Sequence, residues 1–313
     1  MEYITLRNSD LKVSRFCMGG CPMGGYGWGS NVLEKDLINA VHTALDGGVN
    51  FFDTADTYGL GQSELTLGKA LAGRRNEVVI ASKFGVHAKK GEKTYYDNSP
   101  EWIRSSIEGT LKRLNTDYLD LYQIHYRDEK TPLSEVVETL DELKKKGYIR
   151  YYGLSNIHKN DIQEIKNFKG KFVSFQDEYS LACRKNENDM KELSGELELT
   201  PLTWGSLGQG ILTGKYDKNT VFDSNDRRSR EIYVNFHGEK LLKNLEIVES
   251  MKKIAADAGH SVASVAIRFI LDYIPGSVVL AGIKRPQQAL SNLEAFGWQL
   301  SSAQIKTLDD ISK

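Results

Sequence analysis

The chain has 313 residues, 40% of them hydrophobic, and its 41 basic and 42 acidic side chains give a formal net charge of −1. Because the charges are so evenly balanced, we expect neither a nucleic acid nor a membrane surface as a partner. The opening segment, MEYITLRNSDLKVS, lacks the pattern of a signal peptide, and three cysteines do not make a disulfide framework. These features predict a cytoplasmic protein, and its length suits a single barrel domain over residues 1–313.

Short apolar stretches alternate with amphipathic helical patterns from one end of the chain to the other. Residues 3–13 are expected to form a β-hairpin that caps the bottom of the fold. The predicted strands that follow are 15–19, 49–54, 78–84, 118–125, 151–156, 173–178, 199–204 and 277–283. Strands that alternate with helices imply a parallel sheet, either open or closed, and the number of strands favours a closed (β/α)8 TIM barrel.

Three helical patterns are clearest, over 100–115, 133–147 and 239–258, each with its apolar residues on one face. Ser99 and Pro100 open the first of these helices. In the second, Thr131 is expected to be the N-cap, Pro132 to occupy the first turn, and Gly147 to end the helix.

Four ionisable side chains fall at the ends of three consecutive predicted strands, which is where barrel active sites gather. Asp53 ends the second strand with Tyr58 shortly after it, Lys83 ends the third strand, and His125 ends the fourth. We expect Lys83 to lower the pKa of Tyr58, and Asp53 to keep Lys83 charged. A neutral His125 could orient a carbonyl group while Tyr58 protonates its oxygen. Each residue alone could be a turn residue, a surface side chain or a loop histidine, but together they indicate chemistry.

Two runs carry a resemblance to a known family. GVNFFDTADTYGLGQSELTLGKAL, at 48–71, and YLDLYQIHY, at 118–126, are similar to signatures of the aldo-keto reductase superfamily, and the likeness covers nearly the whole chain. The long polar stretch 215–240 resembles the bacterial, stress-protein-like branch. This resemblance implies an NADPH-dependent carbonyl reductase that uses the four residues as its catalytic tetrad, without a metal ion and without a Rossmann domain.

The resemblance also implies where a nicotinamide cofactor binds. Ser155, Asn156 and Gln176 would hold the carboxamide, which needs both a donor and an acceptor, and Trp204 would stack on the ring. Alternatively, Ser155 and Asn156 only cap a helix that starts near residue 158. The expected pyrophosphate site consists of Ser206, Leu207, Gln209 and Gly210, with Lys215 as a neutralising charge.

After the last strand, Lys284 is expected to bind an adenosine 2′-phosphate, with Gln288 and Asn292 near the adenine. Two positive charges here, Lys284 and Arg285, favour NADP over NAD, because sites for NAD usually place an acidic group on the ribose. Three arginines in the polar stretch could also clamp phosphates, but we interpret them as solvated: Arg227, Arg228 and Arg230.

The substrate pocket is expected to be aromatic, with Tyr26, Trp28, Phe84 and Tyr126 as its walls. Such walls suit aromatic or medium-length aldehydes and some ketones as small-molecule substrates. Two other functions remain open at this point. One is a cofactor-binding regulatory subunit resembling potassium-channel beta subunits, and the other is a Schiff-base aldolase with Lys83 as its nucleophile.

Overall fold

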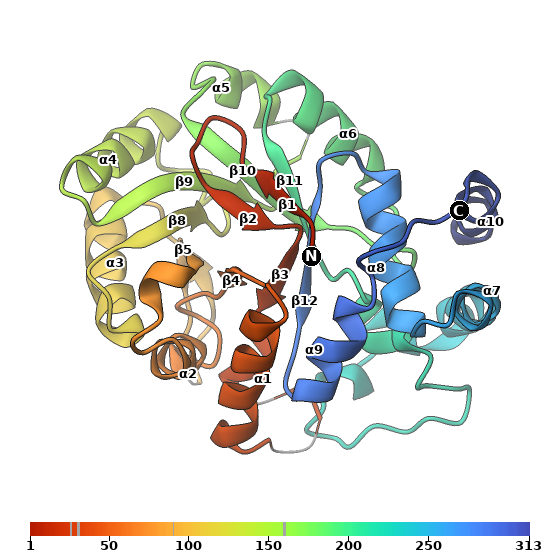
Figure 1. Cartoon of the computed structure of the whole chain (residues 1–313). Helices are drawn as coiled ribbons and strands as arrows, with labels where there is room; N and C mark the ends of the chain where they lie inside the picture. The colour runs from red at the N-terminus through yellow and green to blue at the C-terminus, as the bar shows by residue number, and fades with distance from the viewer. Residues whose placement is uncertain (26, 30–31, 90, 159–160) are drawn as a thin grey trace.

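The computed structural model describes residues 1–25, 27–29, 32–89, 91–158 and 161–313. Eight strands within these ranges form a closed parallel barrel, as predicted, with the order β10-β11-β12-β3-β4-β5-β8-β9 (Figure 1). Their bounds are β3 (Phe16–Gly19), β4 (Phe51–Asp53), β5 (Val79–Phe84), β8 (Leu119–Ile124), β9 (Ile149–Ser155), β10 (Phe172–Glu178), β11 (Thr200–Trp204) and β12 (Val278–Gly282). The pairing of β12 with β3, in which Leu280 lies opposite Cys17, closes the cylinder and excludes the open sheet.

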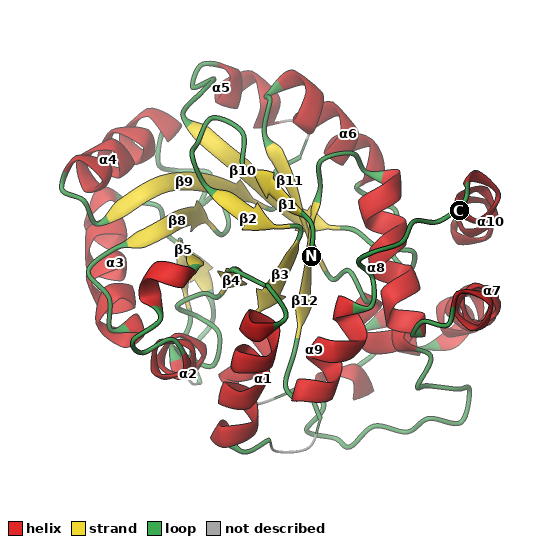
Figure 2. Ribbon diagram, viewed as in Figure 1, coloured by secondary structure: helices red, strands yellow, loops and turns green. Residues whose placement is uncertain are grey.

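Helices surround the barrel on its outside (Figure 2). They are α1 (Glu34–Asp46), α2 (Gln62–Ala70), α3 (Pro100–Leu114), α4 (Leu133–Lys145), α5 (Ile162–Lys166), α6 (Glu187–Glu196), α7 (Gly238–Ala258), α8 (Val262–Tyr273), α9 (Pro286–Leu293) and α10 (Ser302–Ser312). In the described ranges no single helix is long and apolar enough to cross a membrane; α7 and α8 taken together have the length and composition, and they meet at a bend of 96°.

The predicted N-terminal hairpin is confirmed. Strands β1 (Tyr3–Thr5) and β2 (Lys12–Ser14) pair antiparallel. Leu6, Leu11 and Val13 are buried with the side chains that fill the barrel interior. The hairpin therefore closes one end of the cylinder and leaves the other end for a site.

Two hydrophobic layers follow from the alternation of side chains along each strand. Ala81 of β5 points into the barrel and packs with Phe51 and Leu121. Phe84, at the end of the same strand, belongs to the outer layer between barrel and helices. Lys83, between them, is wholly buried. A one-residue difference in position thus decides whether a side chain at a strand end faces the site or the helices.

The predicted start of α3 is confirmed, but the predicted N-cap of α4 is wrong. Ser99 accepts a hydrogen bond from the backbone N–H of Trp102. Thr131, in contrast, donates its hydroxyl to Asp128. The backbone N–H of Leu133, at the start of α4, donates to the Glu164 carboxylate of α5 at 3.1 Å. A tertiary contact has replaced the local cap.

Candidate active site

The four predicted residues meet at the open end of the barrel, where β4, β5 and β8 end. Lys83 Nζ lies 2.6 Å from Asp53 Oδ1 and 3.3 Å from the Tyr58 hydroxyl. It also donates to the Thr54 carbonyl oxygen at 2.9 Å. The His125 ring stands edge-on to the Tyr58 ring, with their centres 5.9 Å apart. The structure therefore brings the four side chains together, as their positions at the ends of the strands predicted.

The loop after β4 turns back over the barrel because of a glycine. Gly59 has a φ of +65°, a conformation that side chains rarely adopt, and it packs directly on Gly24. A Cβ at position 59 would lie 2.2 Å from the Gly24 carbonyl oxygen. The Ser63 hydroxyl ties this loop to the neighbouring one by donating to the Gly20 carbonyl oxygen at 2.8 Å. These contacts fix the backbone that carries Tyr58.

The predicted lowering of the Tyr58 pKa is wrong. Burial raises the pKa of Tyr58 well above 10, and the negative charge of Asp53 adds to the increase. The ammonium group of Lys83 does not reverse this, because it is itself paired with Asp53. Tyr58 is consequently a protonated donor at neutral pH.

His125 behaves as predicted. Burial lowers its pKa well below 6.5, and the positive charge of Lys83 lowers it further. The imidazole is therefore neutral at physiological pH. Its Nδ1 atom is buried and has no hydrogen-bond partner among the described residues.

A glutamine that the sequence analysis missed completes the surroundings of Asp53. The Oδ2 atom of Asp53 accepts from Gln123 Nε2 at 3.1 Å and from Gln176 Nε2 at 3.0 Å. Gln123 lies two residues before His125 on β8, and this spacing was the available signal, because alternate strand residues face the same side.

A cavity of about 1210 Å³ opens in front of the tetrad. Asp53, Tyr58 and His125 line it, and Lys83 is not among its lining residues within the described part of the chain. The other predicted site residues that line it are Trp28, Tyr126, Ser155, Asn156, Gln176, Trp204, Ser206, Leu207, Gln209, Gly210, Lys215, Lys284 and Gln288. Because Lys83 is paired with Asp53 and lies behind the residues that line the cavity, it is badly placed for Schiff-base chemistry, which needs an amine in reach of the substrate.

Two residues that were predicted to line the cavity lie away from it, and a third falls outside the described residues. Phe84 is fully buried against Tyr122, with ring centres 4.7 Å apart, because it points outward from β5. Asn292 is buried in α9 and is not among the described residues that line the cavity. Tyr26 lies outside the described residues.

The polar groups at the ends of β9 and β10 are bound to one another. The side-chain amide of Asn156 donates to the His125 carbonyl oxygen at 2.9 Å and to Ser155 Oγ at 3.1 Å. Ser155 Oγ in turn donates to the Gln176 carbonyl oxygen at 3.1 Å. α5 begins at Ile162, and residues 159 and 160 before it lie outside the described residues, so the alternative that Ser155 and Asn156 cap a helix starting near residue 158 stays a prediction.

The loop after β11 needs its glycines. Gly205, Gly208, Gly210 and Gly214 all have positive φ values, of 66°, 55°, 107° and 74°. A Cβ at Gly208 would lie 2.8 Å from the side chain of Ile211. The Ser206 hydroxyl is turned inward and donates to the Thr203 carbonyl oxygen. Gly205 and Gly210 of this loop line the cavity, and because glycine has no side chain, a diphosphate could approach their backbone closely.

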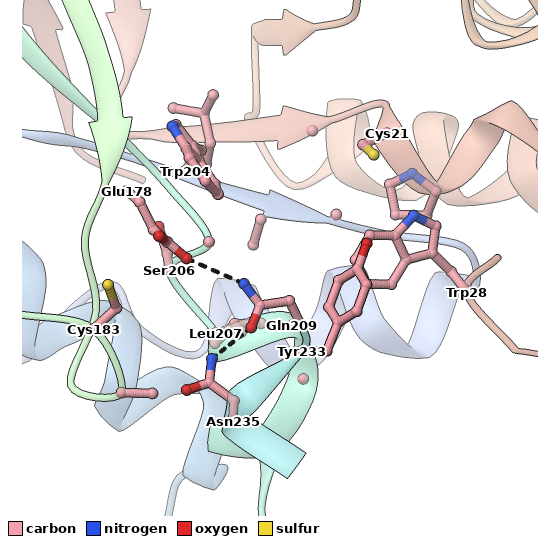
Figure 3. A pocket seen from close by; sticks show the side chains of 18 of the residues that line it. Cys21, Trp28, Glu178, Cys183, Trp204, Ser206, Leu207, Gln209, Tyr233 and Asn235 are labelled. Atoms are coloured by element: carbon pink, nitrogen blue, oxygen red, sulfur yellow. Dashed lines mark hydrogen bonds between the residues drawn. The ribbon is translucent and has the colours of Figure 1, made fainter. Parts of the chain in front are cut away.

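Figure 3 shows a hydrogen-bonded chain across one side of the cavity. Gln209 Nε2 donates to Glu178 Oε1 at 3.3 Å, and the amide of Asn235 donates to Gln209 Oε1 at 2.5 Å. On the other side, the rings of Trp28 and Tyr233 meet edge-on with centres 5.9 Å apart. Three of these residues were not predicted from the sequence, because they come from a strand end and from connecting segments without a local pattern: Glu178, Tyr233 and Asn235.

Basic side chains crowd the end of the cavity near α9. Lys284 is half-buried and donates to the Trp28 carbonyl oxygen. Burial lowers the pKa of Lys284, and the charges of Arg228 and Arg285 lower it further. A phosphate group would relieve this repulsion, so the residues present fit a phosphorylated cofactor at this end.

The expectation that the three nearby arginines are solvated is wrong for Arg228. Its side chain is only 11% exposed, and it is paired with Asp226 at 2.5 Å. Its guanidinium also stacks over the ring of Phe222 at 4.5 Å. Arg227 lies over the ring of Trp28 at 5.8 Å and lines the cavity, whereas Arg230 is exposed.

Comparison with known proteins places this geometry in context. The family model described as "Aldo/keto reductase family" matches residues 17–313. The chain is 34% identical over 316 residues to the aldo-keto reductase YhdN of Bacillus subtilis, covering 99% of this chain and 93% of that protein. It is 29% identical over 327 residues to the NADH-specific methylglyoxal reductase of Escherichia coli, covering 100% and 99%. The solved glycerol dehydrogenase AKR11B4 from Gluconobacter oxydans is similar with a TM-score of 0.89 at 33% identity, covering 99% and 94%.

Proposed function

This chain belongs to the aldo/keto reductase family of oxidoreductases, and we propose that it reduces aldehydes and ketones to alcohols with NADPH, using Tyr58 as the general acid. Small carbonyl compounds are the typical substrates of this family. The observation that carries the proposal is the position of Lys83 Nζ, 2.6 Å from Asp53 Oδ1 and 3.3 Å from the Tyr58 hydroxyl, beside the cavity that Tyr58 and His125 line.

The side chains have separate tasks in this mechanism. Tyr58, kept protonated by burial, donates a hydrogen bond to the carbonyl oxygen and then gives it the proton. The neutral His125 helps to hold the same oxygen. Lys83 stabilises the phenolate that forms on Tyr58, and Asp53 holds Lys83 in place. A bound nicotinamide would supply the hydride to the carbonyl carbon.

Three regions of the cavity support a nicotinamide cofactor. Ser155, Asn156 and Gln176 would hold the carboxamide near the tetrad. The glycine-rich loop 205–214 offers backbone groups to the pyrophosphate. Lys284 would bind the 2′-phosphate. NADPH is preferred over NADH because the α9 end of the cavity is basic, although a relative is named for its specificity for NADH.

The test is loss of NADPH absorbance across a panel of aldehydes and ketones, with wild type and Tyr58→Phe. Since general acid catalysis contributes roughly 10²–10⁴-fold, we expect Tyr58→Phe to lose at least about a hundredfold in kcat while NADPH still binds. Equal turnover by the variant would reject Tyr58 as the acid. A wild-type protein that binds NADPH but reduces no member of the panel would instead support the cofactor-binding regulatory role.

A further inference from the structure

Asp53 accepts hydrogen bonds from two side-chain amides, and the proposed mechanism gives these two hydrogen bonds no role. Its Oδ1 atom is taken by Lys83, and its Oδ2 atom accepts from both Gln123 and Gln176. The two glutamines come from β8 and β10, far apart in the sequence, and both are buried, with 0% and 2% exposure. Gln176 lines the cavity, whereas Gln123 is not among the lining residues in the described part of the chain.

The chemistry of a carboxylate fixes how both amides are turned. An ionised carboxylate only accepts hydrogen bonds, so each glutamine must present its NH₂ group to Asp53. The NH₂ group of Gln176 also lies 3.4 Å from Gln123 Oε1. Both hydrogens of Gln176 Nε2 then have acceptors within the barrel, one on Asp53 and one on Gln123. What Gln176 has left for a molecule in the cavity is its Oε1 atom, which is an acceptor.

The geometry points to Gln123 as a positioning residue that holds Gln176 as a hydrogen-bond acceptor facing the cavity, and so selects a ligand with an N–H donor there. This inference rests on the proposed function, in which that ligand is the carboxamide of the nicotinamide. Without Gln123, Gln176 loses the acceptor for its second hydrogen. The hydrogen bond from Gln176 to Asp53 remains, but with one contact in place of two the amide is held less tightly, and the selection for a donor on the ligand weakens.

The experiment compares the binding of NADP⁺ with that of its 3-acetylpyridine analogue, in which a methyl ketone without N–H groups replaces the carboxamide. Binding is measured by quenching of tryptophan fluorescence, since Trp28 and Trp204 line the cavity. Because one hydrogen bond is worth about tenfold in affinity, we expect wild type to prefer NADP⁺ by about five- to tenfold.

The variants test the role of Gln123 directly. Gln123→Met has a similar length but no amide, and we expect its preference for NADP⁺ to fall to about twofold or less. Gln176→Met should show the same loss, and the double variant should show no further change, because both residues act through one acceptor. Gln304→Met is the matched control. Its amide accepts from the backbone N–H of Ser301 at the start of α10, and Gln304 is not among the described residues that line the cavity, so the preference should persist.

The outcomes separate the inference from the proposed function. An undiminished preference in Gln123→Met would overturn the inference, as would a wild-type protein that binds both dinucleotides equally. Binding of neither dinucleotide would reject the proposed function, and the inference with it. Should Gln123→Met fail to fold, Gln123→Asn replaces it, because this side chain is shorter by one methylene group and keeps a polar end. The same loss of preference is expected from it, and retention would again overturn the inference.

Discussion

The buried ion pair between Lys83 and Asp53 allows stability and catalysis to be separated by mutation. The two side chains are 0% and 4% exposed, and they lie 2.6 Å apart. Lys83→Met removes the ammonium group and keeps an unbranched side chain of similar bulk. Among the described residues, the Asp53 carboxylate is then left in the barrel with the two amide donors of Gln123 and Gln176.

The expected loss of stability comes from the Asp53 carboxylate, which is left without its cation. Removing one partner of a buried pair typically costs about 3–5 kcal/mol in the free energy of unfolding. The two amides that remain on Asp53 place this variant toward the lower end, at about 3 kcal/mol. Adding Asp53→Asn removes the charge, so the double variant should return to within about 1–2 kcal/mol of wild type. Activity should not return, because neither variant can stabilise a phenolate on Tyr58, and kcat should stay at least about a hundredfold low.

Urea unfolding followed by far-ultraviolet circular dichroism measures the first quantity, and NADPH consumption with a reactive aldehyde measures the second. Lys171→Met is a matched control, because Lys171 pairs with Asp141 at the same distance of 2.6 Å, but on the surface, with 48% and 40% exposure. It should cost less than about 1 kcal/mol. The reasoning would be refuted by a double variant that is less stable than Lys83→Met, or by one that regains turnover.

Three further predictions address the cofactor, the loop and pH. Lys284→Ala should weaken the binding of NADPH by about tenfold or more and that of NADH hardly at all, because a charge-assisted hydrogen bond to the 2′-phosphate is lost. Fluorescence titration measures both affinities, and an equal loss for both would contradict the assignment. Gly59→Ala should lower both stability and kcat, because its Cβ would collide with Gly24, whereas Gly73→Ala, with a φ of +78° and nothing within 4 Å of a Cβ, should cost only the strain of about 1–2 kcal/mol. Burial raises the pKa of Asp56 from 3.8 to about 7, so the folded state holds a proton that the unfolded chain releases, and wild-type stability falls as pH rises between these values. The stability of Asp56→Asn relative to wild type should therefore rise from pH 4 to pH 8, by at most about 4 kcal/mol in the free energy of unfolding measured with urea. A difference between variant and wild type that does not change with pH would contradict the raised pKa.

The strands and the tetrad could be predicted from the sequence because their signals are local. Buried strands of a parallel barrel are short apolar runs between loops, and each was found within a few residues of its bounds. In such a barrel all strands end on the same side, so the position of Asp53, Lys83 and His125 at strand ends already brings them together. The glycine-rich run 205–214 was likewise readable, because its backbone requires positive φ values.

Errors arose where a side chain's surroundings come from distant segments. Phe84 was expected in the pocket, but its neighbour Lys83 takes the inward position, and strand alternation sends Phe84 into the outer layer. Arg228 was expected in water, but it is enclosed by Asp226 and the ring of Phe222. Thr131 was expected to cap a helix that Glu164 of another helix caps instead.

The sequence by itself determined the barrel, the hairpin and the placement of four ionisable side chains at strand ends, because hydrophobic alternation and strand ends are properties of adjacent residues. Only the tertiary structure decided how these side chains are charged and turned. Burial sets the protonation of Tyr58 and His125, and the approach of β8 and β10 to β4 joins Gln123 and Gln176 to Asp53. Desolvation and contacts between distant strands depend on how the whole chain encloses a group, and no local pattern records that enclosure.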